Sequence, residues 1–185
     1  MTSVPEPAEI RWGTILLRPW SAADADAVLA AGTDPEIALW NASPVHSRAD
    51  AAAWIARRAD WSEGDHVSLA VVDGLSGELV GSVSLHQIDY DQGDAEIGYW
   101  TAPPARGRGV ASGAVTALCR WVFLQLPIDR IELIHAAENP ASARVAQNAG
   151  FTQEGRLRQS YRYGDGRKHD ELLWSLLRAD LPIDS

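Results

Sequence analysis

The amino-acid sequence predicts one α/β domain whose sheet is mixed and largely antiparallel. Two alternating runs, VSLAVVD and ELVGSVSLHQI, flank turn-forming residues at 73–77 and indicate a β-hairpin. A third run, AEIGYWTA, extends the hairpin to a meander, and helical and strand periodicities alternate after it. The 185 residues are 46% hydrophobic, which suffices for one sizeable core, and no repeat or linker divides them. We therefore expect a single domain over residues 1–185.

The residues before the meander predict a leader, a strand and three helices. Residues 1–12 contain several Pro and Glu residues and predict a frayed leader, and a short strand is expected from about Thr14. Ser21 and Asp24 have the spacing of a capping box, which predicts a helix from there to Gly32. Two further helices are expected, from Asp34–Pro35 through Trp40 and over about 47–61.

The residues after the meander predict two helices interleaved with strands. Apolar residues at helical spacing predict a helix from near Gly109 to Leu126, and the next apolar run predicts a strand over 129–138. Asn139 and Pro140 suit the N-cap and first turn of a short helix that ends before Gly150. Three more strands are expected, from Phe151, around Leu157–Tyr163 and over Lys168–Leu176.

Composition argues against several classes of protein. Asp and Glu outnumber Lys and Arg by 25 to 16, so the formal charge of −9 repels phosphates and we expect no nucleic-acid partner. No apolar run approaches the roughly 20 residues that span a bilayer, and no secretory signal is recognisable, so we expect no membrane association. The single Cys119 cannot form a disulfide framework, and the histidines lack metal-ligand spacing. A cytoplasmic protein without a bound metal is expected.

The segment between the meander and the long helix predicts an anion-binding turn. Gly107 and Gly109 let the backbone approach a ligand closely, and the first turn of the helix supplies free N–H groups. Arg106 and Arg108 add positive charge to an acidic chain. The lysine of a P-loop is missing, and the glycine spacing departs from the dinucleotide-binding fingerprint. The turn suits a pyrophosphate, and the alternative is that it only joins a strand tightly to a helix.

These residues also carry a family resemblance. Arg106-x-x-Gly109-x-Ala111 resembles the Q/R-x-x-G-x-G/A signature of the GNAT superfamily of N-acetyltransferases, with Ala in place of the commoner final Gly. The segments EIGYW at 96–100, NPAS at 139–142 and NAGF at 148–151 resemble its Rim-type branch, the RimJ/RimL-like ribosomal-protein N-acetyltransferases. EG at 154–155 and DELLW at 170–174 do so as well. The resemblance implies the GNAT fold, a mixed six- to seven-stranded sheet with helices on both faces and splayed central strands.

The resemblance further implies which residues bind acetyl-CoA, the acyl donor of the family. The backbone of Trp100, Thr101 and Ala102 would pair with the pantetheine arm, and Asn139 would contact the side of that arm. The pyrophosphate would be wrapped by Arg106, Gly107, Arg108, Gly109, Val110 and Ala111.

Acetyl transfer requires a neutral amine and a proton for the departing thiolate. Glu96 resembles the position of a glutamate proposed in this branch to act as base through water, and its alternative is an exposed strand carboxylate. Ser142 lies in the first turn after Asn139, where its hydroxyl could donate to the coenzyme sulfur or only satisfy the helix start. Three tyrosines are further candidate acids that the sequence does not rank: Tyr99, Tyr161 and Tyr163.

We therefore expect an enzyme that acetylates a primary amine, most simply a protein or peptide N-terminal α-amine, by direct attack in a ternary complex. At pH 7 neutralising an α-amine costs about 1 kcal/mol and a lysine about 4 to 5 kcal/mol, so a modest base suffices only for the first. Acetylation of a small-molecule or antibiotic amine, a non-catalytic acyl-CoA sensor, and a homodimer through the terminal strands remain open. Candidates to line the acceptor pocket, though such residues are more often core, are Trp40, Trp54, Trp61 and His86.

Overall fold

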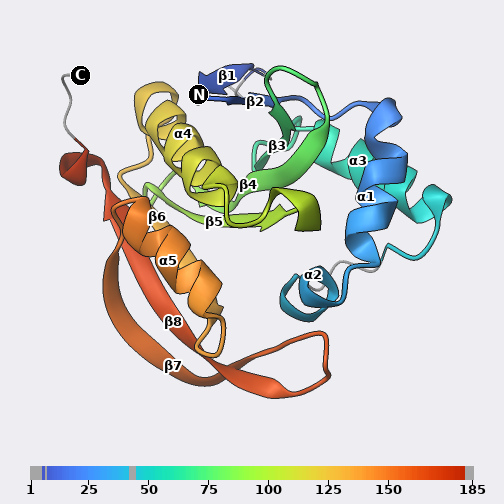
Figure 1. Cartoon of the computed structure of the whole chain (residues 1–185). Helices are drawn as coiled ribbons and strands as arrows, with labels where there is room; N and C mark the ends of the chain where they lie inside the picture. Colours follow the sequence, from blue (N-terminus) through green and yellow to red (C-terminus); the bar gives the residue numbers. More distant parts are fainter. Residues whose placement is uncertain (1–5, 7, 42–44, 182–185) are drawn as a thin grey trace.

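The computed structural model describes residue 6, residues 8–41 and residues 45–181, which form one eight-stranded sheet with helices around it (Figure 1). The strand order is β1-β2-β3-β4-β5-β6-β8-β7, and every neighbouring pair is antiparallel except β5 and β6. This confirms the predicted mixed, largely antiparallel sheet. The strands are β1 (Ile10–Trp12), β2 (Ile15–Arg18), β3 (Val67–Asp73), β4 (Leu79–Asp89), β5 (Asp94–Thr101), β6 (Arg130–Ala136), β7 (Thr152–Arg162) and β8 (Lys168–Leu177).

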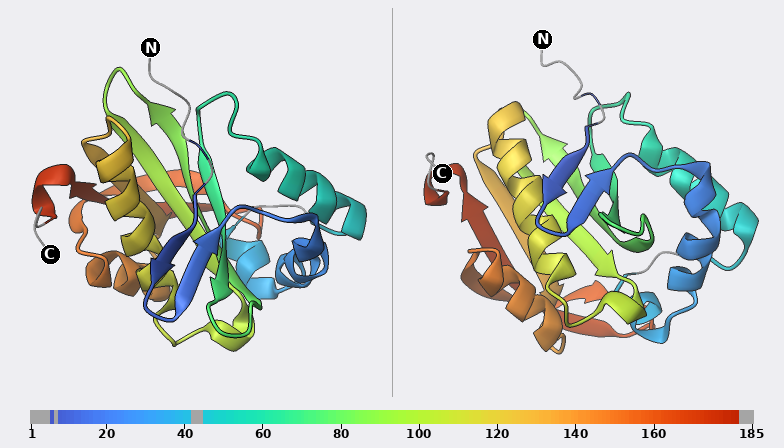
Figure 2. Two further views of the ribbon diagram at one scale, coloured as in Figure 1. Left: turned by 90° about the horizontal axis from the view of Figure 1, so that it is seen from above. Right: turned by 45° about the horizontal axis from the view of Figure 1, so that its top comes forward.

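Helices cover both faces of the sheet, as the resemblance implies (Figure 2). The long α4 packs with α5 against one face, and α1 and α3 cover the other face. The α-helices of the described residues are α1 (Ala25–Gly32), α2 (Pro35–Trp40), α3 (Arg48–Ala59), α4 (Val110–Gln125) and α5 (Pro140–Asn148).

The larger core lies between α4 and the sheet. Leu118 and Val122 of α4 are fully buried against strand residues such as Val83 and Ile131. Each such side chain contributes about 1.5–3 kcal/mol by leaving water, so this layer holds the start of α4 in a fixed position. The smaller core lies under α1 and α3, where the rings of Trp20 and Trp54 meet edge to face at 4.9 Å.

Two predicted strand limits differ from the structure. Ile10–Trp12 pairs with β2, so the leader predicted over 1–12 extends too far, and its residues 1–5 and 7 lie outside the described residues. The two strands predicted from Phe151 and around Leu157–Tyr163 are one strand, β7. Register shifts and a positive φ of 46° at Gln159 interrupt its alternation and make one strand look like two. With β1, the sheet has eight strands where the resemblance implies six to seven.

The central strands β5 and β6 separate after a short pairing, which confirms the predicted splay. They pair only from Asp94↔Arg130 to Glu96↔Glu132. Beyond these residues each strand keeps its other neighbour, β4 or β8, while the edges that face one another diverge. Backbone polar groups along the diverging edges have no strand partner, so they are available to a ligand.

Candidate active site

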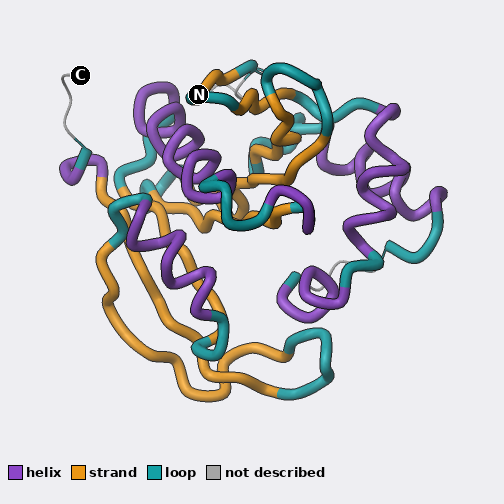
Figure 3. The backbone as a smooth tube through the Cα atoms, in the orientation of Figure 1, coloured by secondary structure: helices purple, strands orange, loops and turns teal. Residues whose placement is uncertain are grey.

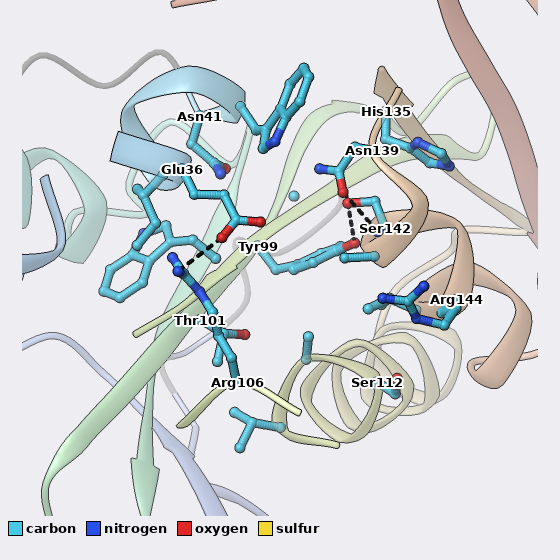
Figure 4. A pocket seen from close by; sticks show the side chains of 18 of the residues that line it. Glu36, Asn41, Tyr99, Thr101, Arg106, Ser112, His135, Asn139, Ser142 and Arg144 are labelled. Carbon is cyan, nitrogen blue, oxygen red and sulfur yellow. Dashed lines mark hydrogen bonds and ion pairs between the residues drawn. The ribbon is translucent and has the colours of Figure 1, made fainter. Parts of the chain in front are cut away.

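A cavity of about 550 Å³ occupies the gap between the splayed strands. Its walls come from the diverging parts of β5 and β6, the turn before α4, the first turns of α4 and α5, and α2 (Figure 4). The tube in Figure 3 shows how the starts of α4 and α5 approach this gap from one face of the sheet. Backbone groups and helix termini therefore surround the space.

The N-terminus of α4 is built differently from those of its neighbours. Side chains of Asp34, Ser47 and Asn139 accept hydrogen bonds from the first turns of α2, α3 and α5. The first residue before α4 is Gly109, and its first turn has no side-chain cap and no acidic residue. The first-turn N–H groups of α4 therefore lie at the cavity wall without a capping side chain, at the positive end of the helix dipole. An anion is the ligand that completes such a terminus.

Gly107 and Gly109 have positive φ values of 72° and 76°. A Cβ atom added at either position would meet nothing within 4 Å. The backbone conformation of this turn, and not crowding by other protein atoms, therefore requires glycine at both positions. The open space above both residues is where a ligand of the turn would lie.

The guanidinium of Arg106 binds the carboxylates of α2. Its Nη2 lies 2.5 Å from Asp34 Oδ1, and its Nη1 lies 2.9 Å from Glu36 Oε2. Burial raises the pKa of Asp34, but hydrogen bonds from Arg106 and the Ile37 N–H outweigh burial and place this pKa below its usual value. Because these partners partly neutralise the arginine, binding of an anion at this turn would depend chiefly on the backbone N–H groups. The partners precede Arg106 by about 70 residues, so sequence reasoning missed them.

Ser142 and Tyr99 meet inside the cavity (Figure 4). The Tyr99 hydroxyl donates to Ser142 Oγ at 2.8 Å, and the Ser142 N–H donates to Asn139 Oδ1 at 3.1 Å. Burial raises the pKa of Tyr99 to about 12, although the bond with Ser142 opposes that shift. Tyr99 therefore stays protonated near neutral pH and acts as a permanent donor. Since Ser142 Oγ accepts this bond, the serine proton remains available to a second acceptor.

Glu96 is not among the residues that line the cavity. It occupies the last position at which β5 pairs with β6, and strand alternation puts its side chain on the face opposite Tyr99. Its carboxylate oxygens lie 3.3 Å from His86 Nε2 and 3.1 Å from Gln87 Nε2. The structure therefore brings Ser142 and Tyr99 together but leaves Glu96 apart from them, beside His86.

Another wall of the cavity joins two segments that are far apart in the sequence. Trp40 of α2 and Tyr163, which follows β7, meet edge to face with ring centroids 5.4 Å apart, and both line the cavity. The N–H of Gly164 donates to the Leu39 carbonyl at 2.9 Å, which attaches the β7–β8 turn to α2. Trp40, a candidate from the sequence for lining the acceptor pocket, therefore does line the cavity. Trp54 and Trp61 are core residues instead, only 6% and 4% exposed.

Residues 14–152 match the family model of the acetyltransferase (GNAT) domain. The chain belongs to the GNAT family of acetyl-CoA-dependent N-acetyltransferases. This match covers well over half of the chain, and the splayed strands and glycine turn of this GNAT protein agree with it.

Two curated relatives and one solved structure are similar to this GNAT protein. YdaF of Bacillus subtilis, provisionally named a ribosomal N-acetyltransferase, is 36% identical over 104 residues, which is 56% of each chain. The p20 protein of Bacillus licheniformis, named an uncharacterized N-acetyltransferase, is 32% identical over 90% of this chain and 94% of its own length. RimJ of Mycobacterium smegmatis, solved with a CoA-disulfide, has a TM-score of 0.84 at 25% identity, covering 95% of this chain and 88% of RimJ. These similarities support the Rim-type branch of the family.

The structure separates the predicted acetyl-CoA residues of this GNAT protein into two groups. Ala102 donates its N–H to the Val80 carbonyl at 2.9 Å, and Arg108 points away toward Asp73 at 3.7 Å with its side chain 58% exposed, so neither lines the cavity. The other eight do line it: Trp100, Thr101, Arg106, Gly107, Gly109, Val110, Ala111 and Asn139.

Other features of the described chain bear on the chemistry. Cys119 is fully buried in α4, and burial raises the pKa of its thiol, so this residue is unsuited to act as a nucleophile. Across residues 6, 8–41 and 45–181, no three His, Cys, Asp or Glu side chains gather as a metal site. The helices in the same ranges are all too short or too polar to cross a bilayer.

Proposed function

We propose that this GNAT protein transfers the acetyl group of acetyl-CoA to the N-terminal α-amine of a protein or peptide. The observation that carries the proposal is the continuity of one cavity. It extends from the uncapped N-terminus of α4, past the Tyr99–Ser142 pair, to the wall formed by α2 and Tyr163. The name of YdaF supports an acceptor of the ribosomal type.

The chain offers a place for each part of acetyl-CoA. The N–H groups at the start of α4 would bind the pyrophosphate, with Gly107 and Gly109 leaving room above the turn. The unpaired edge of β5 at Trp100 and Thr101 would pair with the amides of the pantetheine arm. The acyl end would then lie near Ser142, which follows the N-cap residue Asn139 at the start of α5.

Ser142 and Tyr99 would act on the leaving sulfur. The incoming amine forms a C–N bond with the acetyl carbonyl carbon, and the C–S bond breaks with its electron pair on sulfur. Ser142 donates its proton or a hydrogen bond to that sulfur, because its oxygen is already held by the Tyr99 hydroxyl. Tyr99 fixes the direction of the serine proton and so positions it.

Glu96 would take up the proton that the amine loses. Because its carboxylate is not at the cavity wall, this transfer requires a water molecule, and His86 at 3.3 Å would share the charge. A base that acts through water suits an acceptor amine whose deprotonation requires little free energy. This favours an α-amine, which requires about 1 kcal/mol, over a lysine side chain at about 4 to 5 kcal/mol.

The test is release of free thiol from acetyl-CoA in the presence of N-terminal peptides, lysine peptides, polyamines or aminoglycosides, with calorimetric titration of acetyl-CoA in parallel. Turnover is expected with N-terminal peptides. Turnover with only polyamines or aminoglycosides would establish the small-molecule alternative. Tight acetyl-CoA binding without turnover on the whole panel would establish a sensor, and no binding would refute the cofactor site.

A further inference from the structure

Residues 156–168 concentrate positive charge in a protein that is otherwise strongly acidic. This segment, here called the basic arm, covers the second half of β7, the turn after it and the start of β8. It contains five basic residues and one acidic residue, a net charge of +4, whereas the whole chain carries −9 and the remainder therefore −13. Nearly all of its residues are exposed. Figure 1 shows the β7–β8 hairpin curving out from the body of the sheet.

Most of this charge has no carboxylate partner within ion-pair distance in the described residues, although Arg162 and Lys168 donate to backbone carbonyls. Arg156 is paired with Asp170 at 2.8 Å. Within the described ranges, the other four cations of the arm contact no carboxylate at ion-pair distance; they are Arg158, Arg162, Arg167 and Lys168. Some arginines elsewhere do have such partners, since Arg18 binds Asp24 and Arg130 binds Glu154. The charge of the arm is therefore available to a partner.

The arm also presents the open edge of a sheet. β7 is the last strand in the order, and no described strand pairs with its outer edge. Both faces of β7 are exposed along its length, and Leu157 and Tyr161 remain 37% and 48% exposed. Such an edge offers unpaired N–H and C=O groups that an extended polypeptide can pair with.

The arm leads directly to the cavity. Tyr163, inside the arm, lines the cavity, and the adjacent Gly164 is hydrogen-bonded to Leu39 of α2. A polypeptide whose amine lies in the cavity would therefore pass the arm. Residues 156–163 extend over about 23 Å, a length along which several residues of an extended acceptor peptide could bind.

We propose that the basic arm binds an acidic segment of the acceptor polypeptide, C-terminal to the amine that enters the cavity. The inference rests on the proposed function and adds the class of acceptor: a protein with a free N-terminus followed at a short distance by acidic residues. The carboxylates of Glu36 and Glu96 near the cavity favour the cationic amine and disfavour acidic first residues, so the acidic segment lies further along.

The observations favour a polypeptide over other partners of the same charge. The −13 carried by the rest of the chain repels a long phosphate backbone, whereas a short acidic segment can lie along the arm itself, and charges beyond a Debye length of about 10 Å at 0.1 M salt are largely screened from it. The acidic body of a second copy has suitable charge as well. The place of Tyr163 in the cavity wall connects the arm to the acceptor instead.

The experiment compares two peptides that share their first residues and differ only in an acidic or an uncharged following segment. The arm variant is Arg158→Glu with Arg167→Glu, and the matched control is Arg11→Glu with Arg57→Glu, two exposed arginines outside the arm. In the unaltered protein, kcat/KM should be about tenfold higher for the acidic peptide at low salt, which corresponds to two or three weak ion pairs. The preference should disappear in the arm variant, persist in the control, and decline with added salt.

The outcomes distinguish the two proposals. If the arm variant keeps the preference, or the control loses it equally, the arm does not bind the acidic segment, while acetylation of the uncharged peptide still supports the proposed function. If neither peptide is acetylated, the proposed function fails, and anisotropy with the labelled acidic peptide tests the arm alone. Arm-dependent binding of single-stranded RNA without a peptide preference would overturn the inference in favour of nucleic acid. A change of sedimentation in the arm variant only, again without a preference, would show an interface between copies.

Discussion

The wall that would hold acetyl-CoA comes from one continuous stretch of chain, residues 94–148, whereas the opposite wall joins residues 34–41 to the β7–β8 turn. The first wall uses backbone groups: the edge of β5 and the N-terminus of α4. The second uses side chains, among them Glu36, Trp40 and Tyr163. Arg106 connects the two, because it belongs to the cofactor turn and binds the carboxylates of α2.

Because of this difference, the two walls should tolerate amino-acid substitutions to different degrees. A ligand held by backbone groups depends on conformation, so only residues that set φ and ψ are strictly required. Where side chains from two distant segments bind a ligand, a substitution in either segment can change the affinity or the specificity without disturbing the sheet. We therefore expect substitutions in the second wall to change the acceptor while acetyl-CoA binding is retained.

The largest expected effect lies within the first wall, at the Tyr99–Ser142 pair. Ser142→Ala should lower kcat about 100-fold, and Tyr99→Phe about tenfold, with acetyl-CoA affinity nearly unchanged, because both groups act on the leaving sulfur. The double variant should be no slower than Ser142→Ala, since Tyr99 acts through the serine. Steady-state kinetics and calorimetry test this.

The matched control for these variants is Tyr90→Phe, which removes a buried hydroxyl that has no partner in the described residues. It should leave kcat unchanged. Multiplicative effects of Ser142→Ala and Tyr99→Phe would contradict the positioning role of Tyr99.

The second-largest effect tests whether the backbone N–H groups at the start of α4 bind acetyl-CoA. Gly109→Ala puts a Cβ atom on a residue with φ of 76°, which costs about 1–2 kcal/mol in the left-handed region and should weaken acetyl-CoA binding about tenfold. Gly155→Ala is the control, because that glycine also has open space around it but lacks a positive φ. Equal acetyl-CoA affinities for the two variants, measured by calorimetry, would argue against a ligand at the start of α4.

A smaller effect is expected where Arg106 joins the walls. Arg106→Ala should raise KM several-fold for acetyl-CoA and for the acceptor peptide together, because the turn and α2 lose their common ion pair. Arg108→Ala removes a mostly exposed charge 3.7 Å from Asp73 and should change either KM less than twofold. Initial-rate kinetics with both substrates varied would measure this, and an acetyl-CoA affinity unaffected by Arg106→Ala would show that its guanidinium takes no part in cofactor binding.

The smallest effect concerns stability below neutral pH. His135 is buried at the cavity, with Nδ1 2.8 Å from the Ala136 carbonyl and Nε2 accepting from Trp174 Nε1 at 3.0 Å. Burial lowers its pKa, against weaker opposing effects of the Ala136 carbonyl and Glu171. Because the folded state favours the neutral ring, its contribution is complete above the unfolded pKa of about 6.5 and is lost as pH falls below that value.

Urea unfolding at several pH values would measure this loss, and His135→Asn should flatten the curve. His169 shifts in the opposite direction, since hydrogen bonds with Asp165 raise its pKa despite desolvation, so its contribution is present below about 6.5 and lost as pH rises. His169→Gln should therefore steepen the acid-side loss. A curve unaffected by His135→Asn would contradict the neutral assignment.

Much of the cofactor wall was predictable because its signals are local. The alternation of the meander, the glycines at 107 and 109, and the Asn139–Pro140 cap each depend on neighbouring residues, and the structure has all three as expected. Ala102 and Arg108 do not line the cavity, so their contacts with acetyl-CoA stay predictions; the pairing of β5 with β4 and the direction of one exposed side chain are not visible in a short motif.

The sequence by itself determined most of the segments that become strands and helices, where the chain must take a left-handed turn, and that α4 starts with free N–H groups, since these follow from periodicity and the stereochemistry of single residues. Only the tertiary structure decided that Tyr99 holds Ser142, that Arg106 is bound by α2, that Glu96 lies apart beside His86, and that the basic arm borders the cavity. Such contacts join residues from about ten to more than a hundred positions apart. Their distances depend on how the whole sheet twists and packs, which no local pattern encodes.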